Sequence, residues 1–115
     1  MKGIVMSLFM ARAQYNDEAF KGMVSNPQSR EEAIKGLLGG LGVELKSIYF
    51  APDRGEVYMI IDSDQEKNAT MLMVVFSSGT FRDGEIISLM SMDEMTNSMK
   101  KAGTLLGTYK PANRE

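Results

Sequence analysis

Apolar residues follow two different spacings along this chain, and the spacing changes several times. Where they recur at every second position they indicate a strand, and where they recur at intervals of three and four they indicate one face of a helix. The spacing of two predicts strands at residues 3–12, 43–51, 56–62 and 85–91. The helical spacing predicts three helices, which begin near residues 29, 63 and 91. The polar stretch at 15–28 carries turn residues and is predicted to be a loop.

Each predicted helix begins with the same pair of residue types at the same spacing. A serine is followed three positions later by a glutamate, so that each side chain can accept a hydrogen bond from the other residue's free backbone N–H. Gly42, after the first helix, is typical of a helix end. The pairs are Ser29 with Glu32, Ser63 with Glu66, and Ser91 with Glu94.

The order of these elements predicts an α+β fold. Turn residues at 52–55 separate the second and third strands so closely that the two are expected to form a hairpin. A second turn is predicted at 82–84, before the fourth strand. The order β-α-β-β-α-β is that of the ferredoxin-like split βαβ sandwich, here with a C-terminal helix. Residues 1–103 are predicted to form this domain and residues 104–115 a C-terminal tail.

The predicted first strand is apolar on both sides. Two helices can cover only one face of the sheet, so the other face is expected to be both open and apolar, which implies a partner. Packing of two such faces across a two-fold axis would give a dimeric α+β barrel. We therefore predict a homodimer or a higher homo-oligomer formed through the open sheet face. The alternating residues are Ile4, Met6, Leu8 and Met10 on one side and Val5, Ser7, Phe9 and Ala11 on the other, so both sets are mostly apolar.

The third strand and its neighbours resemble the GYD-domain family. The resemblance covers residues 4 to about 95 and implies a dimeric α+β barrel but no particular activity. Where the family has Tyr and then Asp, this chain has Val57 and Tyr58, so only the glycine of the signature, Gly55, is retained. The residues that carry the resemblance are the segments 29–41, 45–50, 55–61 and 79–82, together with Asp93 and Glu94.

The composition excludes several classes of catalytic and metal-binding site. The 115 residues include eleven Met but no Cys, His or Trp. Without Cys and His the chain lacks thiolate nucleophiles, the commonest general base and the commonest metal ligands. A net charge of −2 with scattered Lys and Arg argues against nucleic acid as a partner. No apolar run approaches the roughly 20 residues that cross a bilayer, and the first apolar segment is interpreted as a strand, not a signal peptide. We expect a cytoplasmic protein without a membrane partner.

The methionines could hold a soft metal or fill a core. Four thioethers, at Met90, Met92, Met95 and Met99, have the residue type that Cu(I) prefers. Their positions at the end of a strand and on one helix face are also those of packing residues. We predict a soft core and dimer interface built from methionines, and no bound metal or cofactor. The residues are Met6, Met10, Met59, Met73, Met90, Met95 and Met99.

Four residues are candidates for ligand binding. Arg12 and Arg54 could bind an anionic group at the mouth of a cavity, and Tyr49 and Tyr58 could donate hydrogen bonds from the sheet. No catalytic residue is assigned, because the strand serines lack both a His and a nucleophile-elbow motif.

Two functions remain open from the sequence. The favoured one is a homodimeric module that binds a small apolar or aromatic molecule, or that serves assembly. The alternative is a cofactor-independent enzyme, such as a monooxygenase or isomerase acting on a small aromatic substrate, which rests on fold analogy. An enclosed cavity containing Tyr49 or Tyr58 beside a polar partner that shifts its pKa would favour the enzyme.

Overall fold

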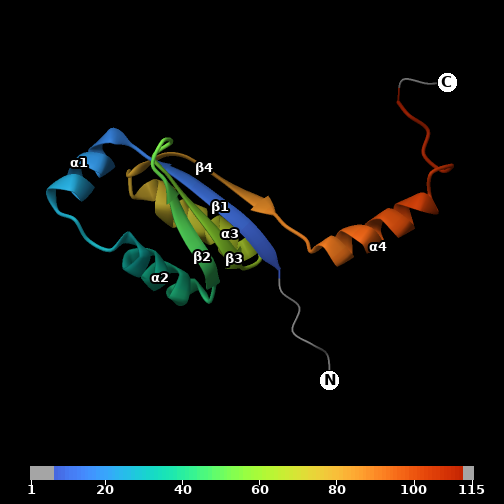
Figure 1. Ribbon diagram of the computed structural model, residues 1–115, viewed down its shortest axis with the longest axis horizontal. Coiled ribbons are helices and arrows are strands. Elements are labelled where there is room, and N and C mark those ends of the chain that lie inside the picture. The colour runs from blue at the N-terminus through green and yellow to red at the C-terminus, as the bar shows by residue number, and fades with distance from the viewer. Residues whose placement is uncertain (1–6, 113–115) are drawn as a thin grey trace.

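Four antiparallel strands form one sheet in the order β2-β3-β1-β4 (Figure 1). The computed structural model describes residues 7–112. The order of strands and helices confirms the predicted α+β, ferredoxin-like architecture, with one helix more than predicted. The strands are β1 (Leu8–Tyr15), β2 (Glu44–Ala51), β3 (Glu56–Asp62) and β4 (Phe81–Ser88). The helices are α1 (Asp17–Ser25), α2 (Arg30–Leu41), α3 (Gln65–Ser77) and α4 (Met92–Gly103).

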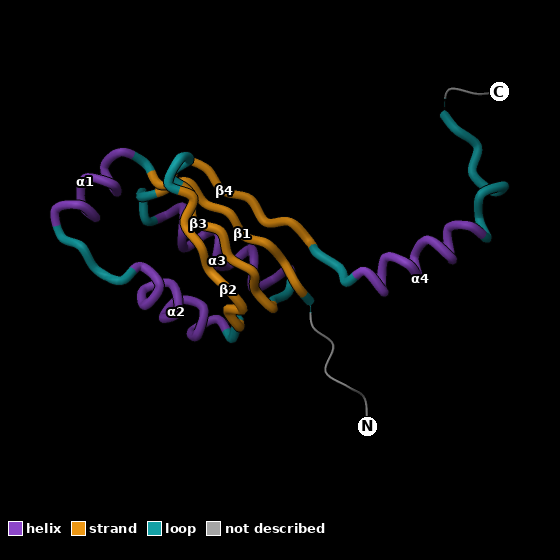
Figure 2. The backbone as a smooth tube through the Cα atoms, in the orientation of Figure 1, coloured by secondary structure: helices purple, strands orange, loops and turns teal. Residues whose placement is uncertain are grey.

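Helices α2 and α3 cover one face of the sheet, and Figure 2 shows α3 behind the strands. The two central strands send every second side chain into this layer, as the period of two predicts. Ile61 is fully buried there, and Leu38 of α2 and Met71 of α3 pack in the same cluster. This covered face is the hydrophobic core of the protein.

The predicted first helix and the hairpin are confirmed. The Ser29 side chain accepts a hydrogen bond from the Glu32 N–H at 3.2 Å, and Gly42 ends α2 in the left-handed region at φ 73°. Strand β3 has the predicted bounds. In the turn before it, Gly55 has a φ of 64°, and a Cβ added there would lie 2.9 Å from the Phe20 ring. Gly55 is therefore required both by its backbone conformation and by its neighbour.

The loop predicted at 15–28 is wrong, because it contains α1. Asn16, interpreted as a turn residue, is the N-cap of this helix: its side chain accepts a hydrogen bond from the Ala19 N–H at 2.9 Å. Asn serves turns and helix N-termini through the same side-chain acceptor. Composition alone did not separate the two.

Two strand boundaries also differ from the prediction. Strand β1 continues to Tyr15, whose N–H donates to the Gly55 carbonyl at 3.1 Å, while residues 3–6 lie outside the described part of the chain. Strand β4 begins at Phe81, so the turn predicted at 82–84 lies within the strand. Gly84 has a packing role there: an added Cβ would lie 3.1 Å from the Phe76 ring and 3.2 Å from the Arg12 carbonyl oxygen.

The predicted start of α3 was one residue early. Asp64, not Ser63, is the N-cap, and its side chain accepts from the Lys67 N–H at 2.9 Å. The Ser63 N–H still donates to the Ser7 carbonyl at 3.0 Å, so Ser63 continues the sheet. The capping box at Ser91 and Glu94 is confirmed with both of its hydrogen bonds.

The methionines were predicted to form a soft core and dimer interface, and the core part is wrong for most of the residues named, while the interface part stays a prediction. Met59 is buried, but Met73, Met90, Met95 and Met99 are exposed, and Met6 lies outside the described residues. For Met95 and Met99 the cause is the position of α4, which projects from the sheet beyond the end of β4 (Figure 1), whereas Met73 lies on the exposed side of α3. No described residue of α4 belongs to the core.

Candidate functional site

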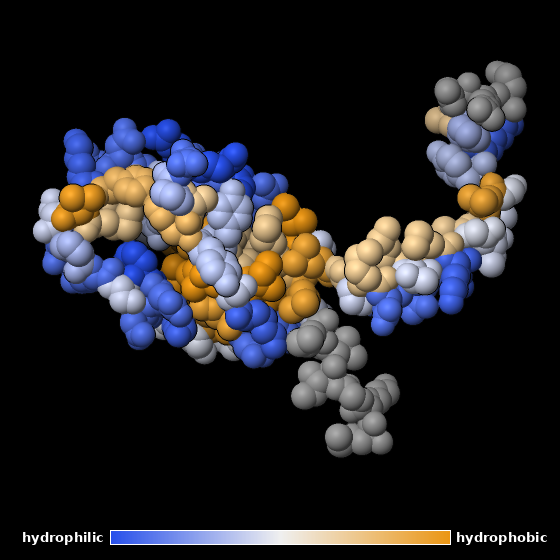
Figure 3. Space-filling model, viewed as in Figure 1, coloured by the Kyte–Doolittle hydropathy of each residue, from blue (hydrophilic) through white to orange (hydrophobic). Residues whose placement is uncertain are grey.

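The uncovered face of the sheet is divided into a polar half and an apolar half (Figure 3). We define the polar half as Arg12, Arg54, Glu56, Tyr58, Asp83 and Glu85, and the apolar half as Met10, Ile60 and Ile87. The expectation of a wholly apolar face was wrong, because β3 and β4 place Glu56, Tyr58, Asp83 and Glu85 on the same face as Arg12.

Strand register brings the polar half together. Arg12, in the central strand β1, pairs with Tyr58 of β3 on one side and with Glu85 of β4 on the other. Glu56 and Asp83 lie two residues along the same strands, and therefore on the same face at the diagonal positions. Every carboxylate in this half can thus reach one guanidinium.

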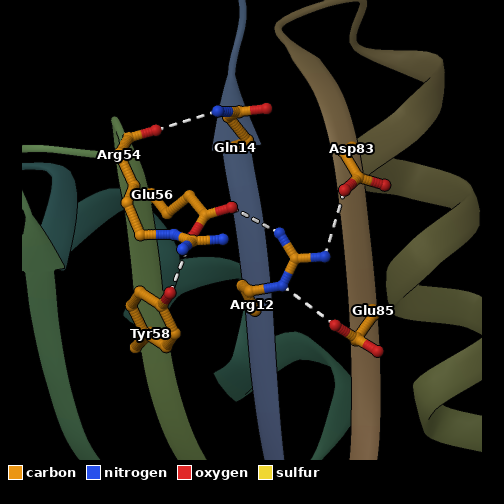
Figure 4. Close-up of polar contacts among 7 residues, drawn as sticks. All are labelled: Arg12, Gln14, Arg54, Glu56, Tyr58, Asp83 and Glu85. Atoms are coloured by element: carbon orange, nitrogen blue, oxygen red, sulfur yellow. Dashed lines mark hydrogen bonds and ion pairs between the residues drawn. The ribbon is translucent and has the colours of Figure 1, made fainter.

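Arg12 is ion-paired to all of these carboxylates (Figure 4). Its Nη2 lies 3.0 Å from Asp83 Oδ2 and its Nε lies 3.0 Å from Glu85 Oε1, while Nη1 bonds Glu56 Oε2. Hydrogen bonds to Asp83 and Glu85, with the pairing to Glu56, raise the pKa of Arg12. The Arg12 guanidinium therefore stays positively charged, and it is held by carboxylates from β3 and β4, the strands on either side of β1.

Glu56 is the buried centre of the network, with 2% of its surface exposed. Its Oε1 accepts hydrogen bonds from the Tyr58 hydroxyl at 2.6 Å and from Arg54 Nε at 2.7 Å. These bonds, together with Arg12, lower the pKa of Glu56 to about 2, and the carboxylate in turn raises the pKa of Tyr58. Glu56 is therefore ionised and Tyr58 protonated at neutral pH. The Glu56 carboxylate is paired with both arginines, and the Tyr58 hydroxyl donates to it.

The structure brings together three of the four residues predicted to bind a ligand. Arg12, Arg54 and Tyr58 all contact Glu56, a residue that the sequence analysis did not single out. Tyr49 pairs with Tyr58 across β2 and β3, but it is 73% exposed and makes no side-chain hydrogen bond to another described residue. A signal was present in the sequence: Arg54, Glu56 and Tyr58 alternate, so they can share one face of a strand.

A cavity of about 390 Å³ lies on the other face, between α1, α2 and strands β2 and β3. Phe20 of α1 packs edge-to-face with both Tyr15 and Phe50, at ring-centroid distances of 5.8 and 6.2 Å. Tyr15 is buried and stacks on Phe81 at 4.7 Å. The apolar and aromatic lining consists of Tyr15, Phe20, Met23, Val24, Ile34, Ile48, Phe50 and Val57.

The polar residues that line this cavity are Arg30, Glu31 and Tyr49. Glu31 Oε2 is paired with Lys35 Nζ at 3.0 Å. Arg30, the first residue of α2, forms no ion pair with any other residue of the described range 7–112. Arg30 also lines a second cavity of about 370 Å³ beside α1. The cavity therefore combines apolar walls with a cation that has no carboxylate partner among the described residues.

The described residues contain no group of three or more His, Cys, Asp or Glu side chains arranged to hold a metal ion. Within residues 7–112, no helix has the length and apolar character needed to cross a bilayer.

The fold and the two faces of its sheet define a class: an α+β, ferredoxin-like domain with helices on one side and an open four-stranded sheet on the other. The sequence model of the GYD domain matches residues 9–99, so the chain belongs to the GYD-domain family. No curated protein and no solved structure matches the chain.

Proposed function

We propose that this chain is a homodimeric module that binds a small apolar or aromatic molecule in the cavity between α1, α2 and the sheet. The observation that carries the proposal is the cavity itself. Its volume of about 390 Å³ lies within the range of small-molecule sites, roughly 300–1,000 Å³. Its walls are aromatic and aliphatic, with few polar groups, which is the usual composition of such a site.

The position of Arg30 further defines the ligand as one with an anionic end. A guanidinium pairs well with a carboxylate, and the N-terminus of α2 adds a positive partial charge at the same place. An aromatic or aliphatic carboxylic acid can place its apolar body against Phe20 and Ile48 and its carboxylate at Arg30. Glu31 does not oppose this arrangement strongly, because Lys35 already neutralises it.

Calorimetric titration with 1-naphthoate and with the neutral 1-naphthalenemethanol tests this proposal. Both are expected to bind, and the carboxylate about tenfold more tightly, which is roughly 1.4 kcal/mol. Arg30→Gln should remove this difference and leave binding of the alcohol unchanged. Lys46→Gln is the control, because Lys46 lies on β2 and is paired with Glu44.

A variant that fills the cavity gives a second measurement. Ile48→Trp should abolish binding of both compounds while the circular dichroism spectrum stays native. Met73→Trp, on the exposed side of α3, is its matched control. If neither compound binds saturably to the wild-type chain, the proposed site is overturned regardless of the results with the variants.

Two features of the open face support homodimerisation through it. Ile87 is exposed, Met10 and Ile60 are half-buried, and Leu89 extends the apolar half beyond β4. The polar half is paired internally, so an interface can cover Arg12 and Glu56 without leaving a buried charge unpaired.

Sedimentation equilibrium at micromolar concentration tests the dimer. Ile60→Lys with Ile87→Lys should shift the protein towards a smaller mass, because two lysines would be buried at the interface. Met73→Lys with Val74→Lys introduces the same charges on exposed apolar positions of α3 and should change nothing. A wild-type monomer at all concentrations would refute this part of the proposal.

The enzymatic alternative receives no support from a specific contact. Tyr58 has a pKa-shifting polar partner, but it lies on the open face and does not line the cavity. Tyr49 lines the cavity, yet no described side chain is hydrogen-bonded to it. We therefore place binding, and not catalysis, in this cavity.

A further inference from the structure

Asn68 is a buried polar residue whose side-chain oxygen has no partner within the described chain. It lies near the start of α3, with 7% of its surface exposed. Its Oδ1 is shielded from solvent, and no hydrogen-bond donor among residues 7–112 reaches it. Most buried polar side-chain atoms in proteins are hydrogen-bonded, because an unpaired one costs stability. The presence of Asn68 at this position therefore requires an explanation.

Neither the helix nor the core explains an asparagine here. Met71 and Val75 follow at helical spacing on the same side of α3, where Met71 belongs to the core and Val75 packs against it. Asparagine is also a poorer helix former than leucine or methionine. A leucine would suit both the helix and the core better, and departures from such local preferences are expected mainly at functional sites. The residue type therefore points to a ligand.

Asn68 lines a cavity of about 440 Å³ between α3, the start of β1 and the end of β4. Its volume lies in the range of small-molecule sites, and Phe9, Leu72 and Ile86 supply apolar walls. The described residues that line it are all uncharged. None of them also lines the cavity between α1 and α2, which contains Arg30. The two cavities therefore differ in the charge of the ligand that suits them.

We propose that this α3–β4 cavity binds a small neutral molecule with an apolar body and a primary carboxamide. An N–H of the carboxamide donates to Asn68 Oδ1 and its carbonyl accepts from Nδ2, because two amide groups are complementary in donors and acceptors. The Asn68 amide turns towards the ligand about its Cβ–Cγ bond, whose rotation is only weakly restricted. A charged ligand is disfavoured, because burying its charge without a counter-charge is costly. The proposal does not depend on the α1–α2 cavity.

Calorimetric titration with 2-naphthamide and with methyl 2-naphthyl ketone tests the assigned hydrogen bonds. The two compounds have the same shape, but the ketone has a methyl group in place of the NH₂ donor. The amide should bind the wild-type protein about tenfold more tightly, because the ketone leaves a buried acceptor unpaired. Asn68→Leu should remove this preference, while Asn97→Leu, the same substitution at an exposed position of α4, should keep it. Equal binding of the two compounds to the wild type, or no saturable binding of the amide, would overturn the proposal.

The stability of Asn68→Leu separates a binding role from a structural one. In the absence of ligand, this variant should have a higher midpoint of thermal unfolding than the wild type, because an apolar group of similar size replaces an unpaired buried amide. A lower midpoint would show that Asn68 serves the fold and would overturn the proposal.

Three further variants locate the amide in the full-length protein. Ala69→Trp, at an exposed residue that lines the α3–β4 cavity, should abolish amide binding, whereas Met73→Trp, on the exposed side of the same helix, should not. Ile48→Trp fills the α1–α2 cavity and should leave the affinity for the amide unchanged. Loss of amide binding in Ile48→Trp would overturn this proposal, whereas failure of 1-naphthoate to bind the wild type would overturn only the α1–α2 site.

Discussion

The two faces of the sheet are held by different interactions. The covered face places Ile61 and Val57 against α2 and α3, and its energy comes from apolar surface removed from water. The open face places Arg12 and Glu56 in a network of ion pairs, beside a small apolar half. Apolar burial depends little on which apolar residues are in contact, whereas an ion-pair network requires particular charged atoms at particular distances. We therefore expect the covered face to set stability and the open face to set specificity of pairing.

The largest expected effect compares neighbouring residues on opposite faces. Ile61→Ala should lower the free energy of unfolding by about 2–5 kcal/mol, because it leaves a cavity in the core. Ile60→Ala should lower it much less and should instead weaken self-association. Urea unfolding at one fixed protein concentration, with sedimentation of both variants, checks the contrast. Similar stability losses would mean that the two faces do not divide their roles.

Acid should affect the open face selectively. The folded-state pKa of Glu56 is lowered from 4.5 to about 2, so the stabilisation it gives is fully present above about pH 5 and is lost as the pH falls towards 2. Thermal unfolding across this range should show that loss. Glu56→Gln should be less stable at pH 7 and less sensitive to acid, while Glu85→Gln, whose side chain is half exposed, should keep the wild-type slope.

A smaller effect is expected where the hairpin meets α1. Gly55→Ala must adopt a positive φ, at a cost of about 1–2 kcal/mol, and must also displace the Phe20 ring. Gly79→Ala has a similar φ of 74° but nothing within 4 Å of the added Cβ. The difference between their unfolding free energies measures the Phe20 contact alone. Equal values would show that Phe20 moves aside freely.

The smallest effect should be a gain. Gly36 lies inside α2 with nothing within 4 Å of an added Cβ, so Gly36→Ala should stabilise the protein by about 0.5–1 kcal/mol. Gly84→Ala, where the Phe76 ring and a backbone oxygen are close, should destabilise it. Denaturant unfolding of both variants checks the opposite signs.

Local signals explain which parts of the fold the sequence could predict. Capping pairs and turn residues act within a few positions, and they located α2, β3 and the start of α4. Gly84 and Asn16 led to the wrong predictions of a turn at 82–84 and a loop at 15–28. A glycine needed for close packing and an asparagine that caps a helix are the same residue types that turns prefer. The role of Gly84 is explained by its tertiary neighbour Phe76, whereas Asn16 is identified as a cap by the N–H of Ala19, three positions along the chain.

The candidate site was less predictable than the fold. Arg12 and Glu56 are 44 positions apart in the sequence, and their contact depends on the register of two strands. Arg30 was overlooked because its importance comes from a cavity beside α1, a helix that the sequence analysis did not predict. Candidate residues could be named from strand alternation, but their partners required the sheet.

We expect the Arg12 network to favour the correct alignment of the strands as the sheet forms. A slip of one residue in β3 or β4 would turn its carboxylates to the covered face, away from Arg12 and among apolar side chains. The Arg12 guanidinium pairs with carboxylates that lie 44, 71 and 73 positions away in the sequence. These pairs therefore form together only when both β3 and β4 are in the correct register with β1. Misaligned sheets, whose unpaired strand edges could associate with other chains, are thereby disfavoured.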